Sequence, residues 1–191
     1  MMEAIIDFLF DAFARLGTRS YGSEGVTMVE HMLQTAALAE RAQAADALIA
    51  AALLHDIGHF GTDFPWYRMS SEHRQMLRRR IDRHHEQAGA QLLQPYFGPE
   101  ITEPIRLHVA AKRYLCAVEP EYFDKLSPTT QHTLSLQGGP MTANEVMEFE
   151  ATAYAPQAVT LRRWDEQATV PGMKTPPGEH YRVLLERLMR S

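Results

Sequence analysis

The chain has 191 residues, of which 45% are hydrophobic and 23% are charged, and its formal net charge is -5. This composition is ordinary for one globular domain, and the acidic balance argues against nonspecific nucleic-acid binding, which depends on basic residues. The single cysteine excludes an intrachain disulfide, and acidic residues near the start argue against a signal peptide. No apolar run reaches the roughly 20 residues that a bilayer span needs. We therefore expect a cytoplasmic protein without a membrane partner.

Apolar residues at helical spacing predict a helix over residues 5–16. Thr27 and Glu30 form a capping-box pattern that begins a second helix. Residues 46–57 are a nearly continuous apolar segment, which predicts a third helix that ends at Gly58. After a loop with glycine and proline, a basic helix over 71–83 and a helix over 86–93 are expected.

Helix signals continue through the second half of the chain. The helices predicted there begin at Thr102, Ser127, Thr142, Pro156 and Glu179. No segment shows the alternation of a half-buried strand, and no repeat or low-complexity stretch divides the chain. We therefore expect an all-α fold, a single helical bundle over residues 1–191 with a site in its core.

The segment LLHDIGH, residues 53–59, is the most informative part of the sequence. A histidine and an aspartate stand side by side at the end of an apolar helix, and His59 follows one turn after His55. Burying such a pair without a partner costs several kcal/mol. A metal ion removes that cost, because imidazole and carboxylate are ordinary ligands for iron, manganese or zinc. An ion pair at a helix end is the alternative explanation.

Further possible metal ligands lie on other predicted helices. A lone histidine on an apolar helix face is more often a core or surface residue than a ligand, so no single one decides. Four histidines and two aspartates together are about what two ions need when one carboxylate bridges them, and Asp56 is the natural bridge. The candidate ligands are His31, His55, Asp56, His85, His108 and Asp165.

The order His, His-Asp, His, His, Asp resembles that of the HD-domain superfamily. Four longer segments resemble its phosphonate-cleaving oxygenases, a branch related to myo-inositol oxygenase: residues 107–116 (LHVAAKRYLC), 122–128, 136–141 (LQGGPM) and 161–165 (LRRWD). The resemblance implies a helical fold and a mixed-valent Fe2+/Fe3+ centre that uses O2. It also implies one iron on His31, His55, Asp56 and Asp165, and the other on Asp56, His85 and His108. His85 is preferred to its neighbour His84 because the family pattern resembles His-Glu-x-x-Gly.

The resemblance also implies roles for residues around the metal. Tyr21 and Glu24 would cover one iron and move when substrate binds, although Tyr21 could be an ordinary aromatic residue in a glycine-rich loop. Lys112 lies one turn after His108 on the same helix face. A cation beside a metal ligand makes sense if an anion such as a phosphonate bridges them, and His59 could approach the same anion. A solvated lysine and a helix-end histidine are the alternatives.

Three neutral side chains complete the candidate substrate site. Ser127, Thr130 and Gln137 could donate hydrogen bonds to phosphonate oxygens, or could serve only as helix-cap and loop contacts. The amine end of the substrate has no assigned partner, because a trimethylammonium would need an aromatic box. The aromatic residues that could supply one are Trp66, Tyr67, Tyr96, Phe97, Tyr122, Phe123 and Tyr154.

The activity that the resemblance implies is O2-dependent cleavage of a carbon–phosphorus bond. The substrate would be 2-amino-1-hydroxyethylphosphonate, which gives glycine and phosphate, or its N-trimethyl analogue, which gives glycine betaine, each supplied by an upstream hydroxylase. An HD phosphohydrolase of a nucleotide or phosphomonoester and a noncatalytic nucleotide-binding module are the alternatives. The additional histidines His85 and His108 and the loop that carries Tyr21 favour the oxygenase. The sequence does not indicate the oligomeric state.

Overall fold

Helices make up most of the structure, a computed structural model that describes residues 3–16, 18, 20–21, 25–60 and 84–190. They are α1 (Glu3–Leu16), α2 (Met28–Arg41), α3 (Asp46–Leu54), the 3-10 helix η1 (Ile57–Phe60), α5 (His85–Leu93), α6 (Pro99–Val118), α7 (Pro120–Lys125), α8 (Pro128–Leu136), α9 (Ala143–Glu150), α10 (Ala155–Gln167), the 3-10 helix η2 (Gly178–Tyr181) and α11 (Arg182–Leu188). Within these ranges no strand occurs, only an isolated bridge between Ser20 and Thr27. The predicted all-α fold is confirmed.

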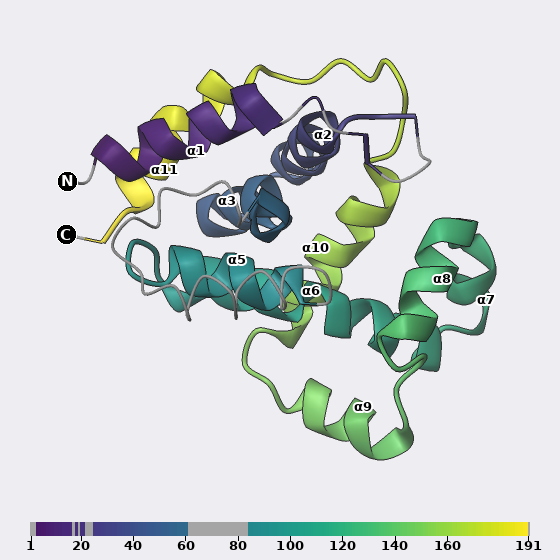
Figure 1. Cartoon of the computed structure of the whole chain (residues 1–191). Helices are drawn as coiled ribbons and strands as arrows, with labels where there is room; N and C mark the ends of the chain where they lie inside the picture. Colours follow the sequence, from purple (N-terminus) through teal and green to yellow (C-terminus); the bar gives the residue numbers. More distant parts are fainter. Residues whose placement is uncertain (1–2, 17, 19, 22–24, 61–83, 191) are drawn as a thin grey trace, which may run out of the picture.

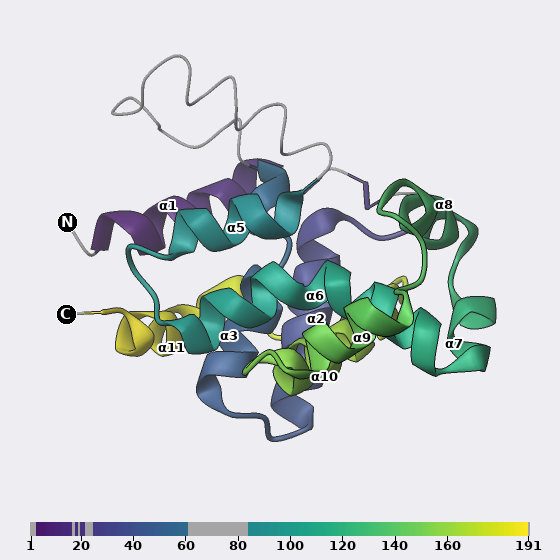
Figure 2. The same cartoon turned by 90° about the horizontal axis from the view of Figure 1, so that it is seen from below.

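The long helix α6 is the centre of the arrangement, because it packs against α10, α5 and α3 (Figures 1 and 2). On the other side of α3 lies α2, which also contacts α10. The two terminal helices, α1 and α11, lie beside each other at one end of the molecule, and α7, α8 and α9 lie at the opposite end. Four helices thus surround the segment between α3 and η1.

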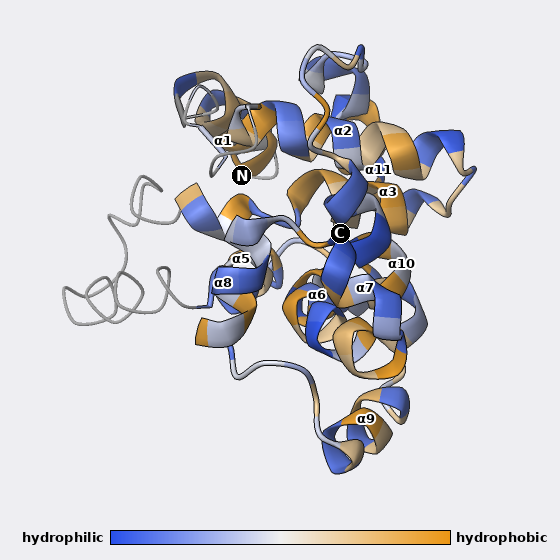
Figure 3. Cartoon of the chain, turned by 90° about the vertical axis from the view of Figure 1, so that its right-hand side faces the viewer, coloured by the Kyte–Doolittle hydropathy of each residue, from blue (hydrophilic) through white to orange (hydrophobic). Residues whose placement is uncertain are grey.

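Hydrophobic patterning explains which helices lie inside. Residues 49–54 of α3 are all buried, because the helix is apolar on every side and so has no face to offer to water. Along α2 and α6 hydrophobic and hydrophilic residues are interspersed (Figure 3), as expected for helices with one face toward the core. The main core cluster joins α1, α2, α3, α5, α6, α10 and α11. No helix in the described ranges is long and apolar enough to cross a membrane.

Capping residues set several helix starts as the sequence predicts. Thr27 Oγ1 accepts a hydrogen bond from Glu30 N, and the Glu30 carboxylate accepts one from Thr27 N, so the predicted capping box is present. The same reciprocal pair forms between Thr142 and Glu145 at the start of α9. The basic helix expected over residues 71–83 lies outside the described residues.

Three predicted helix boundaries are wrong. The helix expected to run to Ile57 ends at Leu54, because the chain turns there into the 3-10 helix η1, where Gly58 meets the backbone of α5. Helix α6 begins at Pro99, which suits a first helical position, and not at Thr102. The expected helix over 179–190 is divided into η2 and α11.

Candidate metal centre

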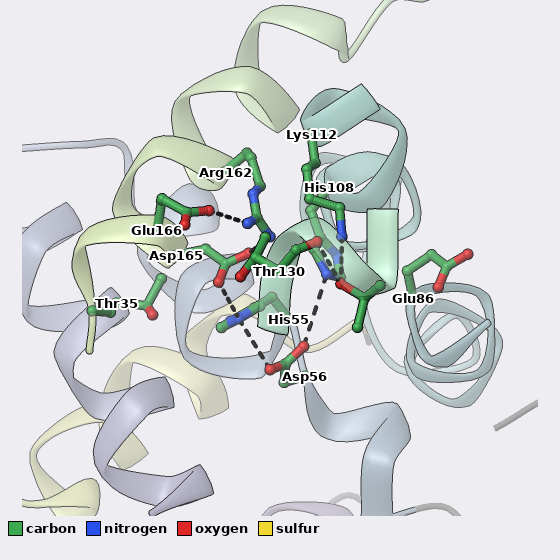
Figure 4. Close-up of polar contacts among 12 residues, drawn as sticks. Thr35, His55, Asp56, Glu86, His108, Lys112, Thr130, Arg162, Asp165 and Glu166 are labelled. Atoms are coloured by element: carbon green, nitrogen blue, oxygen red, sulfur yellow. Dashed lines mark hydrogen bonds and ion pairs between the residues drawn. The ribbon is translucent and has the colours of Figure 1, made fainter. Parts of the chain in front are cut away.

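The six predicted ligands converge in the core, although they come from different parts of the chain. Figure 4 labels His55, Asp56, His108 and Asp165 among them. His31 lies on α2, His108 on α6 and Asp165 on α10, while His85 begins α5. His55 and Asp56 lie in the turn between α3 and η1. Five of the six are buried, and the side chain of His85 is 15% exposed.

The first group of donor atoms surrounds one carboxylate oxygen of Asp56. The Nε2 atoms of His31 and His55 lie 3.1 Å apart, and each faces Asp56 Oδ2, at 3.6 Å and 3.5 Å respectively. Asp165 Oδ1 lies 3.2 Å from His31 Nε2 and 3.8 Å from His55 Nε2. Two imidazoles and two carboxylates therefore point at one small volume.

The second group surrounds the other oxygen of the same carboxylate. His85 Nε2 lies 3.2 Å from Asp56 Oδ1, and His108 Nε2 lies 3.8 Å from it. The two Nε2 atoms are 3.1 Å apart. Each group contains one donor atom from Asp56 and one from each of two histidines. These three atoms lie within 4.8 Å of one another, a spacing that could hold a metal ion. Asp56 can thus serve two ions, one through each oxygen.

Backbone carbonyls orient three of the imidazoles. The Nδ1 atoms donate to carbonyls at 3.0 Å (His31 to Ala168), 2.9 Å (His55 to Ala52) and 2.7 Å (His108 to Ile105). A ring that donates from Nδ1 keeps its Nε2 lone pair free for a metal ion. These carbonyls carry no sequence signal, so sequence reasoning missed them.

Burial and neighbouring charges shift the pKa values of the donor groups in different directions. Burial lowers the pKa of His55, and burial together with the nearby His85 lowers the pKa of His108 well below its usual range, so both rings are neutral. Burial alone would raise the pKa of Asp56, but the surrounding imidazoles lower it well below its usual range. Burial alone would lower the pKa of His31 and His85, but hydrogen bonds to Asp165 and Asp56 respectively raise it. Metal binding needs neutral imidazoles, so an ion would displace any proton from these two rings.

Arg162 was not among the predicted site residues, yet it holds one of the ligands. Its Nη1 contacts Asp165 Oδ2 at 2.5 Å, which leaves Asp165 Oδ1 facing the histidines. Its other nitrogens bind the Glu166 carboxylate and the Tyr122 hydroxyl. Arg162 is 6% exposed. The spacing of three residues between Arg162 and Asp165 on one helix was the available signal.

A second missed contact fixes the end of α10. The side-chain amide of Gln34 donates to Val170 O at 2.9 Å and accepts from Val170 N at 3.0 Å. Gln34 lies on α2 one turn after His31, and Ala168, the acceptor of His31 Nδ1, lies two residues before Val170. The clasp therefore holds the carbonyl that orients His31.

A close approach of two backbones brings Asp56 to His85. A Cβ atom on Gly58 would lie 2.0 Å from His85 O and 2.7 Å from Gly89 N. Only glycine therefore fits where η1 crosses α5. Gly89 stands four residues after His85, which gives a structural reason for the glycine in the His-Glu-x-x-Gly pattern.

Replacing Gly58 by alanine is expected to lower the free energy of unfolding by about 1–3 kcal/mol, because the clash is with backbone atoms that cannot move aside. The same shift would separate Asp56 from His85 and weaken metal binding there. Urea unfolding measures the first effect and metal titration the second. Gly98→Ala is the matched control, since its Cβ would meet only the mobile Glu100 carboxylate. Equal behaviour of the two variants would contradict this prediction.

The predicted covering and substrate residues lie around these groups. Tyr21 stacks on His31 with ring centroids 3.8 Å apart, and His59 stacks on His85 with centroids 4.0 Å apart. His59 Nε2 is also 3.9 Å from Asp56 Oδ1. Glu24 lies outside the described residues. His84 has a side chain 52% exposed and stands outside the group, whereas His85 lies inside it.

The three neutral side chains have different surroundings. Ser127 Oγ accepts from Thr130 N at 3.2 Å and donates to Thr130 Oγ1 at 3.1 Å, so this pair caps α8. Gln137 ends the same helix, and its Oε1 is buried without a hydrogen-bond partner among the described residues. Thr133, also on α8, accepts from Lys112 Nζ at 3.3 Å. Helix α8 therefore adjoins the lysine that the sequence singled out.

The described aromatic candidates do not form one box. Tyr96 and Phe97 belong to the main core cluster, Tyr154 to a second cluster and Tyr122 to a third. Phe123 is 39% exposed. The remaining two candidates, Trp66 and Tyr67, lie outside the described residues.

The donor set fits a metal centre without sulfur ligands. Each group contains two histidines and an oxygen of Asp56, and two histidines with one carboxylate are typical of non-haem Fe(II) sites that react with O2. Nitrogen and carboxylate donors also suit manganese and zinc.

The chain is similar to one protein family and to several known proteins. A model of the HD domain matches residues 28–141. The [1-hydroxy-2-(trimethylamino)ethyl]phosphonate dioxygenase (glycine-betaine-forming) of Leisingera caerulea is 44% identical over 185 residues, which cover 97% of this chain and 90% of that protein. The hydroxymethylphosphonate dioxygenase of Gimesia maris is 47% identical over 168 residues, or 88% and 80% of the two chains. An uncharacterized protein of Acanthamoeba polyphaga mimivirus is 32% identical over 187 residues, or 96% and 83%.

Proposed function

The chain belongs to the HD-domain family, and from its similarity to phosphonate dioxygenases there we propose that it cleaves the carbon–phosphorus bond of a 1-hydroxyphosphonate with O2. The relatives are named for a trimethylammonium substrate and for hydroxymethylphosphonate, which share a hydroxyl on the carbon that bears phosphorus. The products here would be phosphate and glycine, or glycine betaine from the trimethylated substrate.

The proposed cofactor is a pair of iron ions in the mixed-valent Fe2+/Fe3+ state. When bound, iron would supply activation of O2, and O2 is the oxidant that accepts the electrons removed from the substrate. The chain's own buried residues would hold the ions. His31, His55, Asp56 and Asp165 would hold one ion, and Asp56, His85 and His108 the other.

The surroundings of Lys112 are the main support for an anionic substrate. It is 3% exposed and lies one turn after His108 on α6. Within the described part of the chain its ammonium forms no ion pair with a carboxylate and donates to the neutral Thr133 hydroxyl. A buried cation is costly unless it is paired. A phosphonate oxygen beside the metal would supply the missing negative charge.

Other residues would position the substrate or close the site. His59, with a side chain 35% exposed, stands at the edge of the second group and would contact a phosphonate oxygen. Tyr21 covers His31, so substrate that reaches the first group would displace it, together with Glu24. Ser127, Thr130 and Gln137 stay predicted hydrogen-bond donors to the phosphonate.

Other sequence predictions remain part of the proposal. We extend the HD domain to residues 1–191, because Asp165 lies beyond the matched stretch and yet faces the same histidines. A hydroxylase would have to supply the substrate, since the reaction needs a hydroxyl on the carbon next to phosphorus. The cytoplasmic location and the lack of a nucleic-acid partner stay predictions.

The test is phosphate release by iron-loaded protein with and without O2. The three substrates are (R)-2-amino-1-hydroxyethylphosphonate, its N-trimethyl analogue and hydroxymethylphosphonate. Release that needs O2, with glycine or glycine betaine as the second product in the first two cases, supports the proposal. Release that ignores O2 would identify a phosphohydrolase, and no release from any of the three would reject the substrate class.

Phosphonate affinity is expected to fall above about pH 8. Burial and the positive charge of Arg162 lower the pKa of Lys112 to about 8, so the amine is charged below that pH and neutral above it. Binding an anion then requires proton uptake, and the dissociation constant should rise up to about tenfold per pH unit. A metal ion on His108 would lower this pKa further, so the fall should begin no higher than about pH 8.

The measurement is anaerobic calorimetry with a 1-hydroxyphosphonate from about pH 7 to about pH 9.5. Lys112→Arg is the control, because a guanidinium keeps its charge over this range and should flatten the profile. The same slope in both proteins would show that another group titrates.

A further inference from the structure

One of the four clustered histidines is oriented differently from the others. His31, His55 and His108 each donate from Nδ1 to a backbone carbonyl at 3.0 Å or less. His85 makes no such hydrogen bond to the described residues, although its Nε2 lies among the donors as closely as theirs. A metal-binding histidine nearly always donates its other ring N–H to an acceptor. His85 Nδ1 therefore needs an acceptor other than a backbone carbonyl of the described residues.

Glu86 offers an acceptor close to His85 Nδ1. Its Oε2 lies 3.7 Å from His85 Nδ1, and its side chain is 7% exposed. That oxygen has no hydrogen-bond partner among the described residues, while Oε1 lies 3.4 Å from Nδ1 of the exposed His84. Leaving a buried acceptor unpaired costs about 1–3 kcal/mol, so this one requires an explanation. A helix N-terminus favours a carboxylate, but an exposed one would serve equally well.

The two metal groups also differ in negative charge. The group around His31 and His55 includes Asp165 as well as an oxygen of Asp56. The group around His85 and His108 shares Asp56 and has no carboxylate of its own among the described ligands. Glu86 lies outside the side chains that surround Asp56 (Figure 4), on the Nδ1 side of His85. It could supply this second negative charge through the imidazole ring.

We propose that Glu86 is a positioning residue that accepts the hydrogen bond from His85 Nδ1 and so strengthens metal binding at the group formed by Asp56, His85 and His108. A small rotation of the Glu86 side chain converts the 3.7 Å approach into a hydrogen bond. The carboxylate then fixes the ring orientation and makes Nε2 a stronger donor. The inference rests on the two-ion centre of the proposed function and is independent of the substrate.

The experiment titrates metal-free protein with Fe2+ under anaerobic conditions and resolves the two binding steps by calorimetry. Glu86→Ala should weaken one ion by about 10–100-fold and leave the other within about twofold. Glu86→Gln should weaken it less, because the amide oxygen still accepts the hydrogen bond but carries no charge. Gln87→Ala, an exposed neighbour on α5, is the matched control and should bind both ions normally.

A double-mutant cycle separates this role from a general effect on folding. In a His85→Ala background, Glu86→Ala should have no further effect on the weakened ion, because the residue acts through the imidazole. Three results would each overturn the role of Glu86 but not the two-ion centre. They are wild-type affinity for both ions in Glu86→Ala, equal weakening of both ions, and full additivity with His85→Ala. A wild-type chain that binds fewer than two ions would overturn the two-ion centre and this inference with it.

Discussion

Replacing Asp56 by alanine is expected to weaken both metal ions by at least about 100-fold and to abolish phosphonate cleavage, because the two oxygens of one carboxylate face different histidine groups. After the change, His85 and His108 would keep two imidazoles and no carboxylate. The first group would retain Asp165, but it would lose the charge that lies between the two ions. Iron content per chain after anaerobic loading is the measurement.

Asp165→Ala is the informative comparison, because this carboxylate faces one group only. It should weaken one ion and leave the second in place. Asp124→Ala, which removes an exposed carboxylate on α7, should change neither. An Asp56→Ala protein that still binds two ions would remove the bridging role, whatever its activity.

Replacing Arg162 by methionine is expected to lower the free energy of unfolding by about 3–5 kcal/mol, the largest effect on stability that we anticipate. The guanidinium is 6% exposed and binds both the Asp165 and the Glu166 carboxylates. Without it, two carboxylates would remain in the core with less positive charge around them. Asp165 would also be free to turn both oxygens toward His31 and so change its mode of metal binding.

The neighbouring Arg163 is a matched control on the same helix. It pairs with Glu119, but both side chains are more than 40% exposed, so Arg163→Met should cost no more than about 1 kcal/mol. Urea unfolding of the metal-free proteins compares the two directly. Similar losses in both variants would mean that the buried ion pairs of Arg162 add little to stability.

Sequence-based predictions were confirmed where the structure depends only on residues close together in the chain. The two capping boxes form as predicted because each depends on residues three positions apart, Thr27 with Glu30 and Thr142 with Glu145. The end of α3 was misplaced because the chain turns into η1 where Gly58 meets the backbone of α5, and a hydropathy pattern does not contain that contact. The choice of His85 over His84 came from a family pattern and remains a prediction, although His85 alone lies within the donor group.

Contacts between distant segments could not be predicted in the same way. The need for glycine at residue 58 depends on how η1 crosses α5, which no single segment encodes. The clasp between Gln34 and Val170 joins the middle of α2 to the segment after α10, far apart in the sequence, and Gln34 has no feature that marks it as special. The metal candidates were easier to find, because His55 and Asp56 stand side by side after an apolar segment and the order of the other candidates resembles that of a known family.

The long interval between His31 on α2 and Asp165 on α10 has a consequence for the whole chain. An ion that both residues bind would act as a removable cross-link closing most of the sequence into one loop, and constraints on long loops stabilise most. Binding that favours the folded chain also makes stability depend on the free concentration of the ion. In a cell short of iron, the amount of folded protein would then decline together with its catalytic capacity, so that metal supply would control its abundance as well as its turnover.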